Sequence, residues 1–415
     1  MANASIGRVP LLTIFLIFVA GNPIDFPLLS RNSALLAGTS EKQWSIDLVP
    51  YGFHVGESGD ESDYVSDTRV AASDNVVALA MQKLSPASRI EKPRRYLQAR
   101  WDVFLFLFDV NTAKLTAKSG PWTGGLAFDL LATSQGRFLL HLWDYRGSGA
   151  GAKEGEALLL LSPSGEKIKE LHLAAVEPAG RDWAVSISPS RKMLLLTEPR
   201  VDGYHYQIVD ANTLSKQSEW NDTDRKDPVI FAVSDEGLLG ASQPVTQSEP
   251  AEAKGKYEFF VRTFDGQWSP FRTSDCTWQF LSDDVVAGFE ELRGSGNGAG
   301  VNGYRLVVTR LKGTDILSRS IQENHHEFSR SDPFVTSADG RRLASLIDWQ
   351  STAWLWKDLD MGPGGSILYV WALPNPDPVL KAKVSDPFAH YSFSPGGDWI
   401  YIAEQHTLKA IRIPA

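Results

Sequence analysis

The stretch HYSFSPGGDWIYIAEQHTLKAIRIPA, residues 390–415, contains the pattern that decides the fold. Apolar residues alternate with other residues up to Ser394, a Pro-Gly-Gly turn follows, and two more apolar runs cover 399–403 and 408–413. Alternation with a period of two is typical of a β-strand that has one buried face. The stretch therefore predicts three consecutive strands, with no fourth strand after them.

The same pattern of an apolar run, a serine, a short turn and a second apolar run occurs seven times. Serine and aspartate side chains can accept hydrogen bonds from a turn's backbone, and glycine permits positive φ. A third and a fourth run follow in the first six units, as in VFLFLFDVNTAKLTA (103–117) and YQIVDANTLSKQSEW (206–220). Six units therefore have four predicted strands and the seventh has three. The serines lie about 46 to 61 residues apart and are Ser73, Ser134, Ser188, Ser234, Ser282, Ser337 and Ser394.

The missing strand of the last unit is predicted near the N-terminus. QWSIDLVPYG (43–52) alternates like a strand, precedes the first serine unit and belongs to no unit of its own. An open ring would leave an unpaired row of backbone N–H and C=O groups at its edge. We therefore expect Ser45 to Val49 to form the outer strand of the last unit. The sequence predicts an all-β, seven-bladed β-propeller with four-stranded antiparallel blades over residues 43–415, closed by this N-terminal strand.

These units resemble blades of the WD40-like and YVTN-type β-propeller superfamily over nearly all of residues 43–415. FSPGGDWIYIA (393–403) is similar to the first-to-second strand passage of such blades, and FDVNTAKL (108–115) to the third-to-fourth passage. The Gly-His and Trp-Asp signatures of true WD40 repeats are missing, so scaffolding of the eukaryotic WD40 kind is less expected. Because the superfamily hosts many functions, the resemblance implies a fold and no particular activity.

The N-terminal residues have the features of an export signal. Arg8 precedes the apolar run PLLTIFLIFVA (10–20), and the small residue Gly21 follows it. An apolar run of about 11 residues fits a signal peptide, whereas a membrane span needs about 20. We expect a signal peptide at 1–21, a linker at 22–42 and a periplasmic or extracellular propeller. A retained N-terminal anchor is the alternative, and no other membrane association is expected.

Composition and motifs narrow the function. The formal net charge of -9 argues against nucleic acid as a partner. The single cysteine, Cys276, rules out an intramolecular disulfide. The sequence has no G-x-S-x-G, H-E-x-x-H or C-x-x-C motif, so no catalytic residue, metal site or cofactor is predicted. A non-catalytic module that binds a protein, a small molecule or a glycan is the favoured interpretation. A lactonase-like hydrolase with a metal in the channel is the alternative, and a purely structural protein is a third.

The loops of such a propeller divide between two faces, because chain direction alternates from strand to strand. First-to-second and third-to-fourth turns share one face, here called the tight-turn face. Second-to-third loops and interblade connections share the other, the long-loop face. Function concentrates in long loops, although neutral insertions would also lengthen them. The long second-to-third loops are predicted at 83–100, 143–156, 243–256, 291–303 and 348–365.

Four residues of these loops are candidate binding residues, because arginine and tryptophan dominate binding hot spots. Arg94 and Arg95 belong to a basic stretch within 83–100, which could hold an anionic ligand or an acidic partner. Trp349 and Trp354 belong to DWQSTAWLWKDLDMG (348–362), which is suited to carbohydrate or peptide recognition. The alternatives are a solvated basic loop and tryptophans that anchor their loop to the core.

Overall fold

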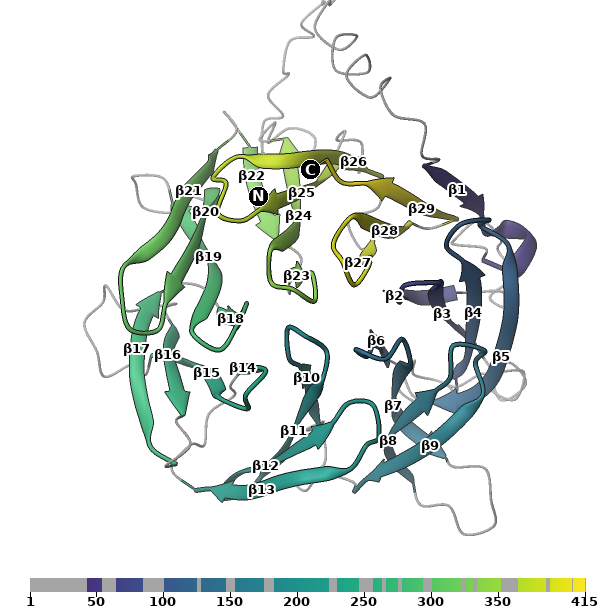
Figure 1. The fold of residues 1–415 in the computed structure, drawn as a ribbon, viewed down its shortest axis with the longest axis horizontal. Helices are drawn as coiled ribbons and strands as arrows, with labels where there is room; N and C mark the ends of the chain where they lie inside the picture. The colour runs from purple at the N-terminus through teal and green to yellow at the C-terminus, as the bar shows by residue number, and fades with distance from the viewer. Residues whose placement is uncertain are drawn as a thin grey trace, which may run out of the picture. The chain divides into compact units, whose positions relative to one another are not determined.

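Seven antiparallel sheets follow one another along the chain and form blades around a central axis in the computed structural model (Figure 1). The predicted seven-bladed, all-β fold is therefore confirmed. The predicted signal peptide and linker lie outside the described residues. In the described part of the chain, no helix is long and apolar enough to cross a membrane. The structure describes residues 43–53, 65–84, 101–124, 128–146, 154–174, 183–223, 230–245, 257–262, 266–274, 278–293, 301–322, 326–330, 334–351, 365–385, 389–404 and 406–414.

Each blade is built from strands that run in order from the axis to the rim. Blade 1 comprises β2 (Val65–Ala72), β3 (Val76–Leu84), β4 (Trp101–Asp109) and β5 (Leu115–Gly124). Blade 2 comprises β6 (Phe128–Ala132), β7 (Phe138–Arg146), β8 (Glu154–Leu161) and β9 (Lys167–Leu173). Blade 3 comprises β10 (Ala184–Ile187), β11 (Met193–Arg200), β12 (Gly203–Asp210) and β13 (Lys216–Asp222). Blade 4 comprises β14 (Ile230–Val233), β15 (Leu239–Pro244), β16 (Tyr257–Arg262) and β17 (Trp268–Ser274). Blade 5 comprises β18 (Trp278–Phe280), β19 (Val285–Arg293), β20 (Val301–Arg310) and β21 (Asp315–Gln322). Blade 6 comprises β22 (His326–Arg330), β23 (Val335–Thr336), β24 (Arg342–Ser351), β25 (Gly365–Ala372) and β26 (Pro378–Val384), and both β22 and β23 pair with β24. Blade 7 comprises β27 (His390–Phe393), β28 (Trp399–Glu404), β29 (Thr407–Arg412) and β1 (Trp44–Asp47).

The N-terminal strand closes the last blade, as the sequence predicted. β1 pairs antiparallel with β29, with Trp44 opposite Ala410. The Trp44 indole nitrogen donates to the carbonyl of Val110 in blade 1 at 2.8 Å, so the closing strand also joins blade 7 to blade 1. The predicted strand, Ser45 to Val49, starts one residue late and ends two residues late, because β1 covers Trp44–Asp47. Val49 begins the 3₁₀ helix η2 (Val49–Tyr51), whose second residue is Pro50, and proline has no N–H to extend the ladder.

Five of the seven predicted serines cap their turns in the same way. The hydroxyl oxygen of each accepts the N–H of a residue at or next to the start of the second strand, at 2.9 to 3.2 Å. The prediction is wrong for blade 2, where the N–H of Thr133, not Ser134, donates to the carbonyl of Arg137 at 2.9 Å. Ser134 cannot take that position because its N–H donates to the carbonyl of Arg191 in blade 3. The capping serines are Ser73, Ser188, Ser234, Ser337 and Ser394.

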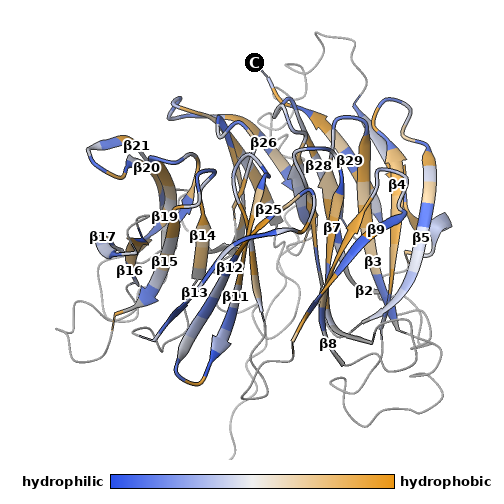
Figure 2. Ribbon diagram, turned by 60° about the horizontal axis from the view of Figure 1, so that its bottom comes forward, coloured by the Kyte–Doolittle hydropathy of each residue, from blue (hydrophilic) through white to orange (hydrophobic). Residues whose placement is uncertain are grey.

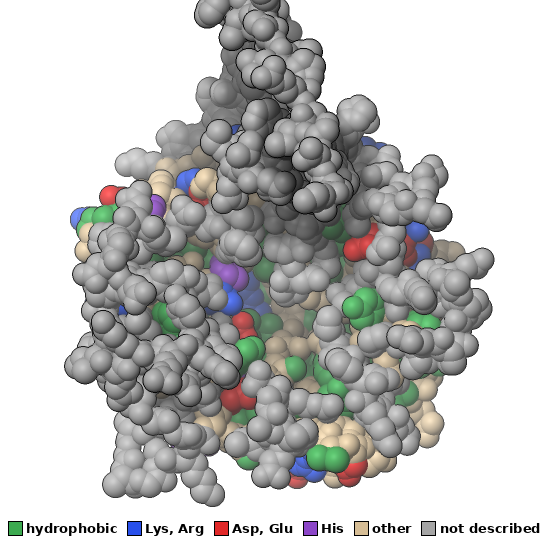
Figure 3. All heavy atoms as spheres, turned by 180° about the vertical axis from the view of Figure 1, so that it is seen from behind, with side chains coloured by type: hydrophobic (Ala, Val, Ile, Leu, Met, Phe, Trp, Pro, Cys, Tyr) green, Lys and Arg blue, Asp and Glu red, His purple; other side chains and the backbone are tan. Residues whose placement is uncertain are grey.

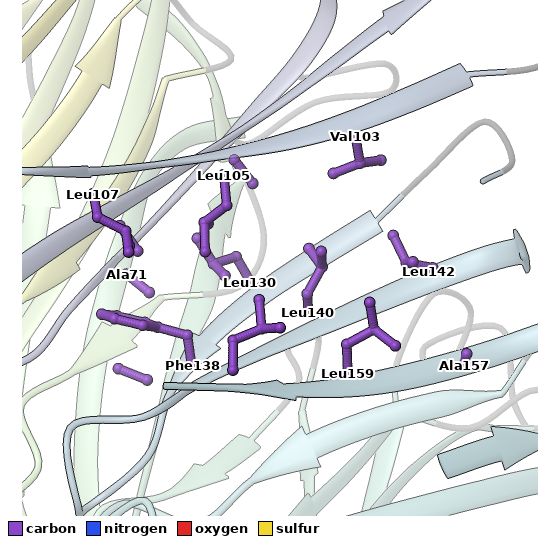
Figure 4. Close-up of a cluster of buried hydrophobic side chains, with 14 residues drawn as sticks. Ala71, Val103, Leu105, Leu107, Leu130, Phe138, Leu140, Leu142, Ala157 and Leu159 are labelled. Carbon is purple, nitrogen blue, oxygen red and sulfur yellow. The ribbon is translucent and has the colours of Figure 1, made fainter. Parts of the chain in front are cut away.

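The core lies between the blades. Among the described residues, buried hydrophobic side chains form one cluster for each pair of neighbouring blades. Between blades 1 and 2, for example, Leu105 and Leu107 pack with Leu130, Phe138 and Leu140 (Figure 4). Hydrophobic residues are concentrated in the inner and middle strands, whereas the rim strand β13 is largely hydrophilic and exposed (Figure 2). The seven interfaces hold the innermost strands around the axis.

Candidate functional site

A cavity of about 710 Å³ occupies the central channel. The residues that line it come from the innermost strands of all seven blades, β2, β6, β10, β14, β18, β23 and β27, and from the residues beside them. Each of these strands is the inner edge of its sheet. The backbone N–H and C=O groups that it does not use to pair with its own blade therefore face the channel. Cavities of this size are typical of small-molecule binding sites.

A buried arginine crosses the channel at its tight-turn end. Arg191 lies in the β10–β11 turn of blade 3 and is only 7% exposed. Its guanidinium donates to the carbonyl of Ala72 in blade 1 at 2.8 Å and to that of Phe393 in blade 7 at 3.0 Å. Burial lowers the pKa of Arg191 to about 10, partly offset by the charge of Asp74, so the side chain stays protonated at neutral pH. Arg191 thus connects three blades across one end of the channel.

Further hydrogen bonds join neighbouring turns on the tight-turn face. The N–H and hydroxyl of Ser190 in blade 3 donate to Asp235 in blade 4 at 2.9 and 2.6 Å. The N–H of Glu236 in blade 4 donates to Asp283 in blade 5 at 2.7 Å. Together with the bond from Ser134 to Arg191, these contacts link blades 2 to 5 in sequence. The polar groups of this face therefore hold the ring together.

The opposite end of the channel carries three charged or titratable side chains, here called the rim cluster: Arg69, Asp129 and His390. They come from the innermost strands of three adjacent blades, 1, 2 and 7. An Arg69 guanidinium nitrogen donates to Nε2 of His390 at 2.5 Å, and Arg69 Nε lies 3.8 Å from a carboxylate oxygen of Asp129. Figure 3 shows the face opposite that of Figure 1, where basic, acidic and histidine side chains gather beside the central hollow.

A buried histidine connects the rim cluster to the interior of blade 2. His141 on β7 has a side chain that is 2% exposed, and its Nδ1 atom lies 3.6 Å from Asp129. Its Nε2 atom lies 2.8 Å from Glu156, and the other oxygen of Glu156 accepts the N–H of Trp183 at 2.8 Å. The Trp143 indole nitrogen donates to Nδ1 of His141 at 3.1 Å. A continuous set of contacts thus runs from the channel to the start of blade 3.

Asp129 and His141 shift each other's pKa. Burial opposes the charged form of His141, but Asp129 and Glu156 outweigh it, so the pKa of His141 is raised above its usual 6.5. Burial likewise opposes ionisation of Asp129, but His141, Arg69 and His390 outweigh it, and the pKa of Asp129 is lowered. At neutral pH Asp129 is therefore a carboxylate, and His141 titrates at or above the ordinary histidine range.

The cavity lining from the inner strands of blades 3, 5 and 6 is largely apolar. Val185 and Ile187 of blade 3 and Val335 of blade 6 line it as half-buried side chains, with Thr336 and Gln279 as neutral polar neighbours. Ala184 of blade 3 lies four residues before its capping serine, the same position as the rim cluster residues. Charged and apolar residues thus line one cavity, which suits a ligand with a charged end and an apolar body.

The structure describes one of the four binding residues predicted from the sequence. Arg94, Arg95 and Trp354 lie outside the described residues. Trp349 is not in a loop, because β24 continues to Ser351 and pairs Trp349 with Phe328 and Gly365. Strands also extend into other predicted loops, and Trp143 and Glu156 are strand residues. Five second-to-third connections are long, as predicted, since β3–β4, β7–β8, β15–β16, β19–β20 and β24–β25 are separated by 7 to 16 residues.

The sequence analysis missed the rim cluster, although its signal was present. Arg69 and His390 each lie four residues before a capping serine, Ser73 and Ser394. Asp129 lies four residues before Thr133, the residue that replaces the serine in blade 2. Comparing this one position across the units would have revealed three charged or titratable residues on adjacent blades. His141 and Arg191 carry no such repeat signal.

Carboxylates are few among the described residues that line the cavity. A channel-centred metal would need several carboxylates or amides that converge on one point, whereas Asp129 is the one carboxylate among the described residues that line the cavity. In the described part of the chain, no three His, Cys, Asp or Glu side chains are grouped so that they could hold a metal ion.

Comparison with known proteins finds similarity in structure but not in sequence. No protein-family model and no curated protein sequence match the chain. Similar solved structures include the β-propeller domain of the Trilobed protease from Pyrococcus furiosus, with 10% identity over 85% of this chain and 95% of that one and a TM-score of 0.49. The WD40 domain of Toxoplasma gondii coronin shows 10% identity over 90% and 86%, with a TM-score of 0.47. Kuenenia stuttgartiensis hydrazine synthase shows 11% identity over 86% and 99%, with a TM-score of 0.47. The seven blades give this chain a β-propeller fold, and no specific family is identified.

Proposed function

We propose that this chain is a non-catalytic binding module that acts outside the cytoplasm and binds its ligand or partner on the long-loop face. The observation that carries this proposal is the difference between the two ends of the channel. At the tight-turn end, Arg191 and the turns around it are engaged in bonds between blades. At the long-loop end, the rim cluster faces a cavity of about 710 Å³.

The long loops add contact surface around the same end. Their positions follow from strand direction, since each begins where a second strand leaves its sheet on the long-loop face. Arg94, Arg95 and Trp354 remain the proposed hot-spot residues of these loops, because arginine and tryptophan give large contact area and directional hydrogen bonds. The cavity suits a small ligand, and the loops suit a larger partner or a glycan that extends beyond it.

Alanine substitutions on both faces test this proposal after an unbiased screen of proteins and glycans has identified a binder. Arg94→Ala, Arg95→Ala and Trp354→Ala are each expected to weaken binding by about 2 kcal/mol or more if they are true hot spots. The matched controls are Arg341→Ala and Lys192→Ala in exposed turns of the tight-turn face. Binding is measured by calorimetry. Loss of binding in the controls but not in the loop variants would contradict the proposed face.

The location is tested separately by N-terminal sequencing of the mature protein. The apolar run at 10–20 leads us to expect cleavage near Gly21 and a mature chain in the periplasm or medium. Replacing Leu12 and Phe15 with arginine should keep the protein in the cytoplasm, because the apolar segment would be interrupted. A mature chain that begins at Met1 in a cytosolic fraction would rule out export.

A further inference from the structure

The carboxylate of Asp129 lies beside Arg69 and His141 but makes a short hydrogen bond with neither. Its side chain is 47% exposed, and the space that it faces is the cavity. The nearest cationic nitrogens are those of His141 at 3.6 Å and Arg69 at 3.8 Å, both beyond hydrogen-bonding distance. A carboxylate can accept about four hydrogen bonds, so Asp129 can accept further donors from the cavity.

The contacts of His141 explain why it does not supply that hydrogen bond. The indole N–H of Trp143 can only donate, so Nδ1 of His141 must be the acceptor in their 3.1 Å contact. The proton of the ring is then on Nε2, where it bonds Glu156 at 2.8 Å. In this neutral form of His141, the atom that faces Asp129 is a lone pair. Asp129 is therefore left for a donor from within the cavity.

The charges around Asp129 favour a cation as that donor. The groups that face it are Arg69 from β2, His141 from β7 and His390 from β27, with Glu156 from β8 behind His141. Nε2 of His390 accepts a hydrogen bond from Arg69. When His141 is neutral, the carboxylates of Asp129 and Glu156 outnumber the guanidinium of Arg69 by one. Coulomb attraction in such a partly enclosed site is screened by water less than in bulk solution.

From this geometry we infer that the channel binds an organic ammonium group at Asp129, with the apolar body of the ligand against Val185, Ile187 and Val335. The inference rests on the proposed binding function and specifies its ligand class. The ammonium donates to the carboxylate of Asp129, and the aliphatic part removes apolar wall from water. Such a group can come from a small amine or from the lysine side chain of a partner, because both present an alkyl ammonium.

Binding of the ammonium is coupled to the protonation of His141. When His141 gains a proton on Nδ1, its N–H can turn to Asp129 and compete with the ligand. Affinity should thus be lowest at acidic pH, rise as pH passes through the raised pKa of His141, and level off above it. The ligand stays charged over this range because alkyl ammonium groups titrate near pH 10.

The experiment titrates the full chain with hexylammonium, and with hexanoate and hexanol as anionic and neutral probes of the same length. Nα-acetyl-lysine amide, whose side-chain ammonium is free, tests whether a lysine side chain can be the source of the ammonium. Calorimetry is run on wild type, Asp129→Asn and Asp202→Asn from about pH 5 to about pH 9. Asp202 is an exposed residue of the β11–β12 turn on the same face, so it gives the same charge change outside the cavity.

Binding of one or both ammonium probes, about 10-fold or more weaker in Asp129→Asn and unchanged in Asp202→Asn, supports the inference. The wild type should gain affinity with pH, and Asp129→Asn should not. Equal affinity of wild type and Asp129→Asn overturns it, as does binding of neither ammonium probe, because solvent would then satisfy Asp129. Preference for hexanoate also overturns the ligand class but leaves the proposed binding function intact, since the channel would still be a ligand site.

Discussion

Replacing Phe53 with alanine is expected to lower the free energy of unfolding by about 3 to 5 kcal/mol. Phe53 follows the closing strand, is fully buried and packs against Phe106 of blade 1 with ring centroids 5.3 Å apart. Its carbonyl lies 3.1 Å from Nδ1 of His406 in blade 7. The side chain therefore belongs to the cluster that joins the last blade to the first. Truncation removes buried apolar surface and leaves a cavity at the point where the ring is closed.

Denaturant unfolding followed by tryptophan fluorescence measures this effect. Val49→Ala is the matched control, because Val49 lies in the same N-terminal segment but is 37% exposed. Its expected change is within about 0.5 kcal/mol. An equally small change in Phe53→Ala would mean that the segment does not hold the ring closed.

Replacing Arg191 with alanine is expected to destabilise the propeller by about 1 to 3 kcal/mol for each of the two buried carbonyls that lose their donor. These are the carbonyls of Ala72 and Phe393, two residues that are fully buried. The loss should be large because Arg191 supplies both bonds from a single guanidinium. Arg191→Lys should restore little of the stability, since a lysine ammonium lacks the planar fork that spans both carbonyls.

A glycine at the same position separates the side chain from the backbone. Arg191 has a φ of 62°, a left-handed conformation that costs a non-glycine residue about 1 to 2 kcal/mol. Arg191→Gly should therefore be less destabilised than Arg191→Ala, while both remain well below wild type in thermal and denaturant unfolding. If Arg191→Ala matched wild type, the bonds across the channel would contribute nothing to the closed ring.

The sequence by itself determined the architecture, because the fold depends on features that repeat. Strand periodicity, the turn serines and the three-stranded last unit are local patterns, and each is repeated often enough to outweigh an error such as the one at Ser134. The closing strand could be placed because an unpaired sheet edge is unfavourable. Its end was misplaced at Val49, where Pro50 stops the ladder.

Only the tertiary structure decided which residues face the cavity and what they contact. Arg69, Asp129 and His390 are far apart in the chain, and they meet because blades 7, 1 and 2 are adjacent around the axis. Arg191 reads in sequence as an ordinary basic turn residue, yet it bonds residues more than 100 positions away. A local pattern specifies which way a strand runs and which side is buried. The partners of a charged side chain depend on ring closure, which brings distant segments together only after all seven blades have packed.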